Sequence, residues 1–499
     1  MTATTLRNRL LRPTLPGLWA FLAIALPAIA GLGASLPTVD LTHHLRAGAD
    51  ILAGRGIPTV DSWTFTAAGS TWLDQQWGAQ VLLAAIFSTT GWVGLAIVRA
   101  GLLALASGLI FVAIRRRAPG IGLRSAALLA LAAFVVTAPA MALRPQLLGV
   151  VLLAGFLVVL SGRHDRPRGL WMLPILAVLW ANLHGSFVLA PAIVGLAWLE
   201  DLVAARYALR APAARRMFAV TIATAAATLI TPFGLGAWRY ALGLATSREV
   251  TARISEWQPP GLADPAGILF WGSALAAGAA VLLISRRRGA LPAWPGLVTL
   301  AAFAGLAALA ARGIAWWPAV AVVTLAGMAG PEAAPAPAAR ATRGSALNAV
   351  IAATLVIAGV LLVPIWRPLD PALGAPAGLL SHAPAGLTAR LREMAGPSDR
   401  VWNPQVWGSW FEFAVPVPAY ALDSRIELIP PAAWSDADIV ARGGDGWEAI
   451  LGRRGVTILV TTSDQGGLVD QLHRSGSWQP AYGDADGALW ILQASLYPR

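Results

Sequence analysis

The side chains best suited to acid–base chemistry lie in one polar stretch, residues 36–77, which follows the first apolar segment. Its acidic and imidazole side chains are Asp40, His43, His44, Asp50, Asp61 and Asp74. The stretch is too polar to lie in lipid and far longer than most connections between elements. Long polar loops on a rigid scaffold often carry function. We therefore interpret residues 36–77 as the first external loop of a membrane enzyme, with a catalytic carboxylate, Asp40, at its start.

The composition is that of a polytopic membrane protein with a smaller water-soluble part. Of the 499 residues, 57% are hydrophobic and only 12% are charged, whereas soluble domains have roughly 25% charged residues. All 37 basic residues are arginine, and they fall in short clusters between apolar segments. This pattern follows the positive-inside rule, so the net charge of +12 reflects topology rather than nucleic-acid binding. The absence of cysteine excludes disulfides and thiolate metal sites.

The apolar segments predict about eleven membrane spans. The first, 18–36, is longer than the ~7–15-residue apolar core of a signal peptide, which favours a retained signal anchor over a cleaved leader. Residues 78–114 are interrupted at 88–92, and they cross once if Arg115–Arg117 is cytoplasmic; two crossings would invert everything downstream. Further spans are predicted at 125–141, 145–161, 170–184, 185–200, 217–233, 266–285, 291–311, 313–329 and 346–364.

This topology places the N-terminus and the Pro/Ala-rich linker 330–345 in the cytoplasm and the C-terminus outside. It also brings the polar groups at the segment ends to one outer face. Those groups are Asp40, His43, His44, Asp61, Gln75, Gln76, Trp77, Arg144, Gln146, Asn182, His184, Thr231–Gly234, Arg253, Glu256, Trp257, Arg312, Trp316 and Trp317. Ionisable groups at membrane depth usually face a cavity. Several helices therefore deliver polar groups to a common outer cavity.

The part after Asp370 alternates predicted strands and helices, which is typical of a small α/β domain. Strands are expected at 400–403, 419–423, 456–461 and 488–493, and helices at 406–414, 434–442 and 467–474. We thus expect a transmembrane domain at 1–366 and an extracytoplasmic α/β domain at 367–499. Asn403 and Asp423-Ser-Arg425 lie at predicted strand ends, where such folds bind ligands; ordinary loop chemistry is the favoured alternative.

The order of short motifs resembles the GT-C superfamily of lipid-carrier-dependent membrane glycosyltransferases, and most closely its bacterial members. The motifs are the loop beginning DLTHHLRAGAD, then WLDQQW, RPQL, NLHGSF, TPFG, ISEW, ARGIAWW and an outer WN…GSW…LDSR pattern. The resemblance implies a sugar donor linked to polyprenyl phosphate. It also implies transfer at the outer membrane face, usually with inversion. The paired acidic motif of many members and the proline-rich loop signature of some branches are absent, so the resemblance does not assign the acceptor.

The resemblance implies that an aspartate directly after the first span is the catalytic base, a position that Asp40 matches. Inverting transfer needs a carboxylate that takes the acceptor's proton as the glycosidic bond breaks. The alternative for Asp40 is a cap on the helix expected at 41–53. Asp61 is the second candidate base, and an ordinary loop aspartate is its alternative.

The leaving phosphate calls for cations, and arginine binds phosphate through paired hydrogen bonds. Arg144 and Arg312 are the first candidates and Arg253 the next, with snorkelling to lipid headgroups as the alternative. The remaining predicted substrate- or phosphate-binding residues are His44, Gln76, Trp77, Gln146, Asn182, His184, Glu256 and Trp257.

Several of these residues have alternatives of their own. His184 would bind phosphate or acceptor, or form a structural hydrogen bond. Glu256 would bind sugar hydroxyls or help hold a metal, or pair with Arg253. Trp77 and Trp257 would stack on a sugar or the lipid chain, or belong to the aromatic belt of the membrane.

No cofactor is required by these patterns. A divalent metal at His43 and His44 with the nearby carboxylates is considered, but their spacing matches no recognised metal signature. The implied partners are a polyprenyl-phosphate-linked sugar, membrane lipids and a glycan, lipid or protein acceptor, with no nucleic acid. The implied location is the bacterial cytoplasmic membrane.

Two other classes of function compete with the glycosyltransferase. A transporter or flippase of a lipid-linked substrate would show matching halves with broken helices, and no such halves are evident. A non-catalytic assembly protein of the cell envelope would make the buried Asp and Arg positions dispensable. The phosphate-loop, dinucleotide, zinc-protease and nucleophile-elbow motifs GxxxxGK, GxGxxG, HExxH and GxSxG are absent.

The topology is testable because the chain has no native cysteine. Single cysteines at Asp40 and after Asp370 should react with an impermeant thiol reagent added outside intact cells. A cysteine at Arg116 should react only after permeabilisation. Labelling of position 116 from outside would contradict this topology.

Overall fold

The computed structural model describes residues 13–330 and 344–493. Most of the predicted linker 330–345 and the basic residues Arg7, Arg9 and Arg12 lie outside the described part. The chain divides into two compact units. The first unit combines Met1–Ala34 with Ala96–Trp366, and the second combines Ser35–Leu95 with Arg367–Arg499. The predicted first external loop thus belongs with the C-terminal domain. The sequence had instead suggested that it is part of the transmembrane domain.

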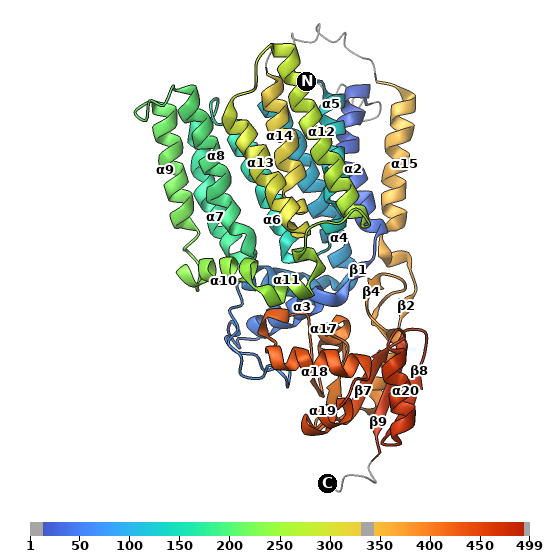
Figure 1. Cartoon of the computed structure of the whole chain (residues 1–499). Helices are drawn as coiled ribbons and strands as arrows, with labels where there is room; N and C mark the ends of the chain where they lie inside the picture. Colours follow the sequence, from blue (N-terminus) through green and yellow to red (C-terminus); the bar gives the residue numbers. More distant parts are fainter. Residues whose placement is uncertain (1–12, 331–343, 494–499) are drawn as a thin grey trace. The chain divides into compact units, whose positions relative to one another are not determined.

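The first unit is a bundle of apolar helices (Figure 1). Its longer helices are α2 (Leu15–Gly33), the second half of α4 (Trp77–Arg117), α5 (Leu123–Thr137), α6 (Pro145–Ser161), α7 (Met172–Leu183), α8 (Leu189–Ala204), α9 (Pro212–Ala227), α12 (Pro265–Arg288), α13 (Trp294–Leu309), α14 (Trp317–Ala329) and α15 (Ala346–Leu362). Each predicted span overlaps one of these helices. In the described part, five helices are long and apolar enough to cross a membrane, so the number of spans stays a prediction.

Local sequence explains where these helices begin and end. Proline occupies the first turn of α6, α9, α12 and α13, where its missing N–H costs nothing. Triple arginines close α4 and α12, where cations oppose the negative end of the helix dipole. The buried Arg99 donates to the carbonyls of Gly31 and Ala34, each at 2.5 Å, and so satisfies the C-terminal end of α2. Within the bundle, α8 packs on α9, α2 on α5 and α15, and α13 on α14.

Helix α4 confirms the predicted interruption at 88–92. It consists of two helices joined at Gly91, whose φ of 59° and ψ of −156° are not helical. Glycine adopts such angles without a side-chain penalty, so this residue allows the break. The apolar part before the break lies in the second unit.

The second unit contains the predicted α/β domain. Its sheet has the order β6-β5-β7-β9-β8, with β5 parallel to β6 and β7, and β9 antiparallel to β7 and β8. The strands are β5 (Arg400–Trp402), β6 (Ala419–Tyr420), β7 (Ile458–Thr462), β8 (Trp478–Gly483) and β9 (Gly487–Leu492). The helices are α16 (Ala385–Met394), α17 (Gln405–Ala414), α18 (Pro431–Arg442), α19 (Trp447–Arg453) and α20 (Gly466–Ser475). All the strands and helices predicted for this domain are present.

The predicted loop helix is also present, as α3 (Thr38–Leu52), but it begins three residues before the expected Leu41. Pro37 occupies its N-cap and supplies no side-chain hydrogen bond, so Asp40 lies inside the first turn and is not the cap. The interpretation of Asp40 as a helix cap is therefore wrong. A carboxylate in the first turn still interacts favourably with the helix dipole.

Residues 35–95 form part of the fold of the second unit. Strand β1 (Leu36–Pro37) pairs in parallel with β4 (Leu380–Ser381), and α3 packs on α17. Thr64 forms a bridge beside Tyr420, and the hydroxyl of Thr66 donates to the carbonyl of Ala421. At the crossing of α3 and the start of α4, Gly48 lies against the carbonyl of Gln80, which leaves no room for a β-carbon. The loop and the domain are consequently one packed body.

Candidate functional site

The first unit gathers three of the predicted residues into one charged cluster. Arg144 directly precedes α6, Glu256 lies in the short helix η4 (Ser255–Trp257), and Arg312 lies in η5 (Ala311–Ala315). Nη1 of Arg144 is 2.7 Å from Oε1 of Glu256, and Nε of Arg312 is 3.8 Å from Oε2. Two guanidinium groups therefore share one carboxylate. An ion pair with Arg253 was the predicted alternative role of Glu256, and the structure pairs Glu256 with Arg144 and Arg312.

Local packing fixes the positions of these groups. The amide of Ala311 donates to the carbonyl of Gln258 at 2.9 Å, which ties η5 to the end of η4. The guanidinium of Arg312 lies 5.1 Å from the ring centre of Trp257, a cation–π arrangement that holds the arginine in place. The predicted stacking residue Trp257 thus supports Arg312.

A cavity of about 230 Å³ adjoins this cluster. Gln146, Ser255, Glu256, Asp264 and Arg312 are among the residues that line it. Within the described residues, Nε2 of Gln146 and Nε of Arg312 are buried and make no hydrogen bond. Buried donors without partners are costly, so they mark places where a ligand would supply acceptors.

The electrostatics of the cavity favour an anion. The first turns of α6 and α12 contribute lining residues, and helix N-termini attract negative charge. Asp264 opposes this effect, but its carboxylate is used to cap α12, accepting from the amide of Ala266 at 3.3 Å. The donors without hydrogen-bond partners, the two arginines and the helix ends are features that suit a phosphate.

Three further predicted residues of the first unit have contacts of their own. The amide of Asn182 donates to the carbonyls of Val178 and Ile230, each at 2.8 Å. His184 caps the short helix η3 (Gly185–Val188), with Nδ1 accepting from the amide of Ser186 at 3.1 Å, which is the structural hydrogen bond considered as its alternative. Arg253 is the last residue of α11 (Arg248–Arg253) and is exposed. None of these three lines the cavity.

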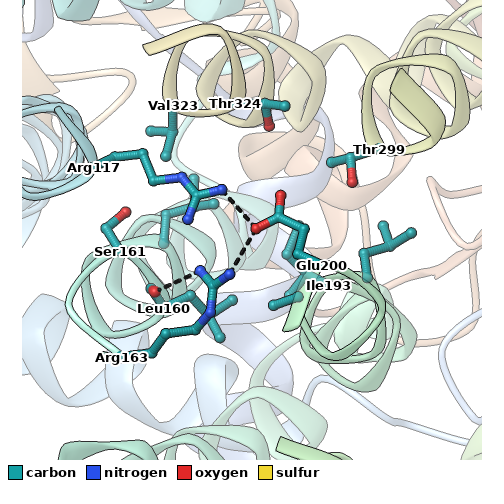
Figure 2. Close-up of a pocket in the computed structure, with 12 residues that line it drawn as sticks. Arg117, Leu160, Ser161, Arg163, Ile193, Glu200, Thr299, Val323 and Thr324 are labelled. Atoms are coloured by element: carbon teal, nitrogen blue, oxygen red, sulfur yellow. Dashed lines mark hydrogen bonds and ion pairs between the residues drawn. The ribbon is translucent and has the colours of Figure 1, made fainter. Parts of the chain in front are cut away.

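A second polar cluster of the first unit was not predicted (Figure 2). Arg117 and Arg163 converge on Glu200 with nitrogen–oxygen distances of 2.6 and 2.7 Å, and Arg163 also pairs with Asp201 at 2.9 Å. The adjoining cavity is only about 40 Å³. Charges in this network are mutually compensated, which indicates a structural role in joining α4, α8 and the turn that follows α6.

In the second unit, Asp40 is half-buried in the first turn of α3. This turn is anchored because the hydroxyl of Thr38 lies 3.0 Å from the carbonyl oxygen of Ser381 and 2.8 Å from that of His382. A carboxylate held on an anchored helix start has a defined position, which a general base requires.

Asp61, the second candidate base, is 2% exposed and fully engaged. Its oxygens accept from the amides of Trp63 and Thr64 at 3.2 Å and from the hydroxyl of Thr64 at 2.6 Å. Nη2 of Arg425 lies 2.7 Å from Oδ1. These contacts use both oxygens to hold the loop, so the described environment of Asp61 is structural.

Arg425 is the centre of this arrangement. It pairs with Asp423 as well as Asp61, and its guanidinium lies 4.3 Å from the ring centre of Trp63 and 4.5 Å from that of Trp72. Burial alone would lower the pKa of Arg425, but Asp423, Glu412 and Asp61 outweigh it and raise the pKa. The LDSR motif therefore contributes to the contact between the domain and the first loop, a role that the sequence motif did not reveal.

The remaining predicted residues lie around the start of α4. Gln76 precedes this helix, Trp77 begins it, and both are half-buried. Nδ1 of His44 lies 3.4 Å from Nε2 of Gln80, which also donates to Asp74 at 2.6 Å. Burial raises the pKa of Asp74 to about 7, although its hydrogen bond from Gln80 opposes the shift.

His43 and His44 do not form a recognisable metal centre. Nδ1 of His43 is 2.9 Å from the hydroxyl of Ser424, and the two imidazole rings are 3.9 Å apart. Within residues 13–330 and 344–493, no group of three or more histidine and acidic side chains could hold a metal ion.

No family model matches the chain, and no curated protein sequence matches it. Solved structures of the oligosaccharyltransferase of Archaeoglobus fulgidus do match. That of AglB in complex with an inhibitory peptide and a dolichol-phosphate has a TM-score of 0.55 and 13% identity, covering 96% of this chain and 75% of AglB. The structure of the apo form has a TM-score of 0.51 and 12% identity, covering 95% of this chain and 74% of the oligosaccharyltransferase. The structure of a complex with Zn and sulfate has a TM-score of 0.52 and 14% identity, covering 96% of this chain and 74% of the oligosaccharyltransferase.

The chain has a GT-C fold. AglB is a member of the GT-C superfamily, and the match extends over nearly the whole chain. The resemblance read from the short motifs is thereby confirmed at the level of the fold. Identities of 12–14% show the fold alone, so the activity rests on the site and is argued below.

Replacing Arg425 by methionine should strongly destabilise the second unit. The change keeps an apolar stem but leaves Asp61 and Asp423 buried without their cation, a loss that typically costs about 3–5 kcal/mol. Thermal unfolding of the purified variant and tryptic cleavage at the exposed Arg55 would measure the effect.

Arg390→Met is the matched control, because Arg390 pairs with Glu393 on the surface and such pairs contribute about 0–1 kcal/mol. Equal melting temperatures of the two variants would contradict the proposed role of Arg425.

Proposed function

We propose that this protein is a membrane glycosyltransferase that transfers a sugar from a polyprenyl-phosphate donor to an acceptor at the outer face of the bacterial cytoplasmic membrane. The observation that carries the proposal is the cavity beside Arg144, Glu256 and Arg312, whose buried donors lack acceptors. A fold shared with AglB, one structure of which contains a dolichol-phosphate, supports a lipid-linked phosphate as the occupant.

In the proposed reaction Asp40 is the general base. Its carboxylate takes the proton of the acceptor's nucleophilic group while that group attacks the anomeric carbon of the sugar. The bond between the anomeric carbon and the phosphate oxygen breaks, and the electron pair stays on the phosphate. Attack opposite the leaving group inverts the anomeric centre.

Arg144 and Arg312 receive the negative charge of the departing phosphate. Guanidinium groups bind phosphate oxygens in pairs, and their stabilisation grows as charge develops. Glu256 holds the two arginines near one another and is available to sugar hydroxyls. Gln146 supplies a further donor. No step of this proposal passes through a metal ion.

The acceptor is proposed as a glycan, lipid or protein. One AglB structure is in complex with an inhibitory peptide and another is tethered to an acceptor peptide, which makes a peptide one candidate class. The proposed orientation puts the cytoplasmic N-terminus opposite the extracytoplasmic C-terminal domain, as the arginine clusters predict.

Arg312→Gln and Arg144→Gln should each weaken use of the lipid donor. Loss of one charge-assisted contact costs about 1.5–3 kcal/mol, which corresponds to a roughly ten- to hundredfold rise in the donor KM or fall in kcat/KM. Transfer by purified protein from a polyprenyl-phosphate-sugar series would be measured against the exposed Arg239→Gln in α10. Donor dependence identical to that of Arg239→Gln in both variants would leave the two arginines as structural residues.

Asp40→Asn should reduce transfer by about 10²–10⁴ because the amide cannot take the acceptor's proton. The substitution preserves size, so the melting temperature should change little. The assay uses the same donors, with the exposed Asp464→Asn as a control. Near-normal turnover of a stable Asp40→Asn protein would remove Asp40 from the mechanism. Failure of the unmutated protein with every donor would favour a transporter or an assembly protein.

A further inference from the structure

A larger cavity, of about 480 Å³, lies wholly within the second unit. Arg46 and Asp50 of α3 line it, with Arg55 from the following turn, Phe87 of α4, and Glu412 and Phe413 of α17. No role is predicted from the sequence for any of these side chains except Asp50, as one of the loop carboxylates. None of them belongs to the proposed transfer site.

Arg46 is the least tightly paired charge around this cavity. Asp50 and Arg55 pair with each other at 2.5 Å, and Arg55 is 71% exposed. Arg46 has no hydrogen-bonded carboxylate among the described residues: its nearest, Glu412, is 3.8 Å away. The guanidinium of Arg46 lies 4.4 Å from the ring centre of Trp63, and its side chain is 26% exposed.

Glu412 forms no hydrogen bond with Arg46 through its carboxylate. It is 1% exposed, and neither of its carboxylate oxygens has a hydrogen-bond partner in the described part of the chain. Burial raises the pKa of Glu412 well above its usual range, and the nearby Asp423 and Asp61 raise it further, although Arg425 and Arg46 act in the opposite direction. Arg46 is partly exposed and lines the cavity, so its guanidinium donors can bind the anionic group of a ligand.

The rest of the lining suits the body of such a ligand. Phe87 and Phe413 meet edge to face, with ring centres 5.6 Å apart, and present apolar surface. The carboxylate of Asp50 can accept hydrogen bonds from hydroxyl groups. The C–H faces of a sugar ring pack on aromatic rings while its hydroxyls bond to charged side chains. A volume of about 480 Å³ lies within the ordinary range of small-molecule sites.

We propose that this cavity binds a small organic anion that carries hydroxyl groups, such as an acidic or phosphorylated sugar, with its anionic group on Arg46 and its body against Phe87 and Phe413. Binding here requires no lipid-linked donor. Absence of the proposed transfer reaction would therefore not contradict this binding site, and absence of binding here would not contradict the transfer reaction.

The test is direct binding to the purified full-length chain, by calorimetry and thermal shift at neutral pH and fixed ionic strength. The probes are glucuronate, glucose 6-phosphate and, as the neutral comparison, glucose. Both anions should bind saturably and glucose at least about tenfold more weakly, because it cannot pair with Arg46. Tightest binding of glucuronate would identify a carboxylate ligand, and tightest binding of glucose 6-phosphate a phosphate ligand; either supports the site.

Arg46→Gln should weaken binding of both anions by at least about tenfold. Arg46→Met keeps the apolar stem against Trp63 and should lose binding equally, so it serves if the first variant is unstable. Glu412→Gln removes the nearest carboxylate while keeping Arg46 and should not weaken anion binding, and the exposed Arg390→Gln should leave the affinities within a few-fold. The proposal is overturned if neither anion binds saturably, if glucose binds as tightly, or if a stable Arg46 variant binds as well as the unmutated chain.

Discussion

The buried guanidinium of Arg425 is the constraint on which the second unit depends. A charge taken out of water is tolerated only when it is paired and hydrogen-bonded, and here Asp61 and Asp423 pair with it between the rings of Trp63 and Trp72. Asp61 comes from the first loop and Asp423 from the C-terminal domain. Because carboxylates from both parts pair with one buried guanidinium, the loop and the domain fold as one body, and the helix that carries Asp40 starts from a fixed frame.

The polar clusters of this protein differ in how completely their charges are paired, and this difference indicates their roles. Arg117, Arg163, Glu200 and Asp201 neutralise one another around a cavity too small for a substrate, so they join helices. The cluster of Arg144, Glu256 and Arg312 differs, because two cations share one carboxylate beside a roomier cavity with unpaired donors. A binding site differs from a structural ion pair because it has buried donors without acceptors beside a cavity large enough for a ligand.

The same reasoning applies to α3, which carries two different chemical features on one helix. Asp40 lies in its first turn. Arg46 lies between Trp63 and the cavity, and no described carboxylate forms a hydrogen bond with Arg46. Placing a carboxylate and a loosely paired cation on one short, anchored helix couples their positions. A ligand on Arg46 would therefore act on the element that also holds the proposed base.

The local features follow from the sequence. Apolar runs predicted the longer apolar helices of the first unit, the break at Gly91 and strands β5, β6, β7 and β9, because periodicity and glycine act over a few residues; α10, α11 and β8 were not predicted. It also singled out Arg144, Glu256 and Arg312 as chemically notable. Tertiary packing set their surroundings: Glu256 pairs with Arg144 and Arg312, Asp61 pairs with Arg425, and Asp40 lies within a helical turn rather than at its cap. Ion pairs and burial join residues distant in the chain, and packing alone fixes which of many arginines meets which carboxylate.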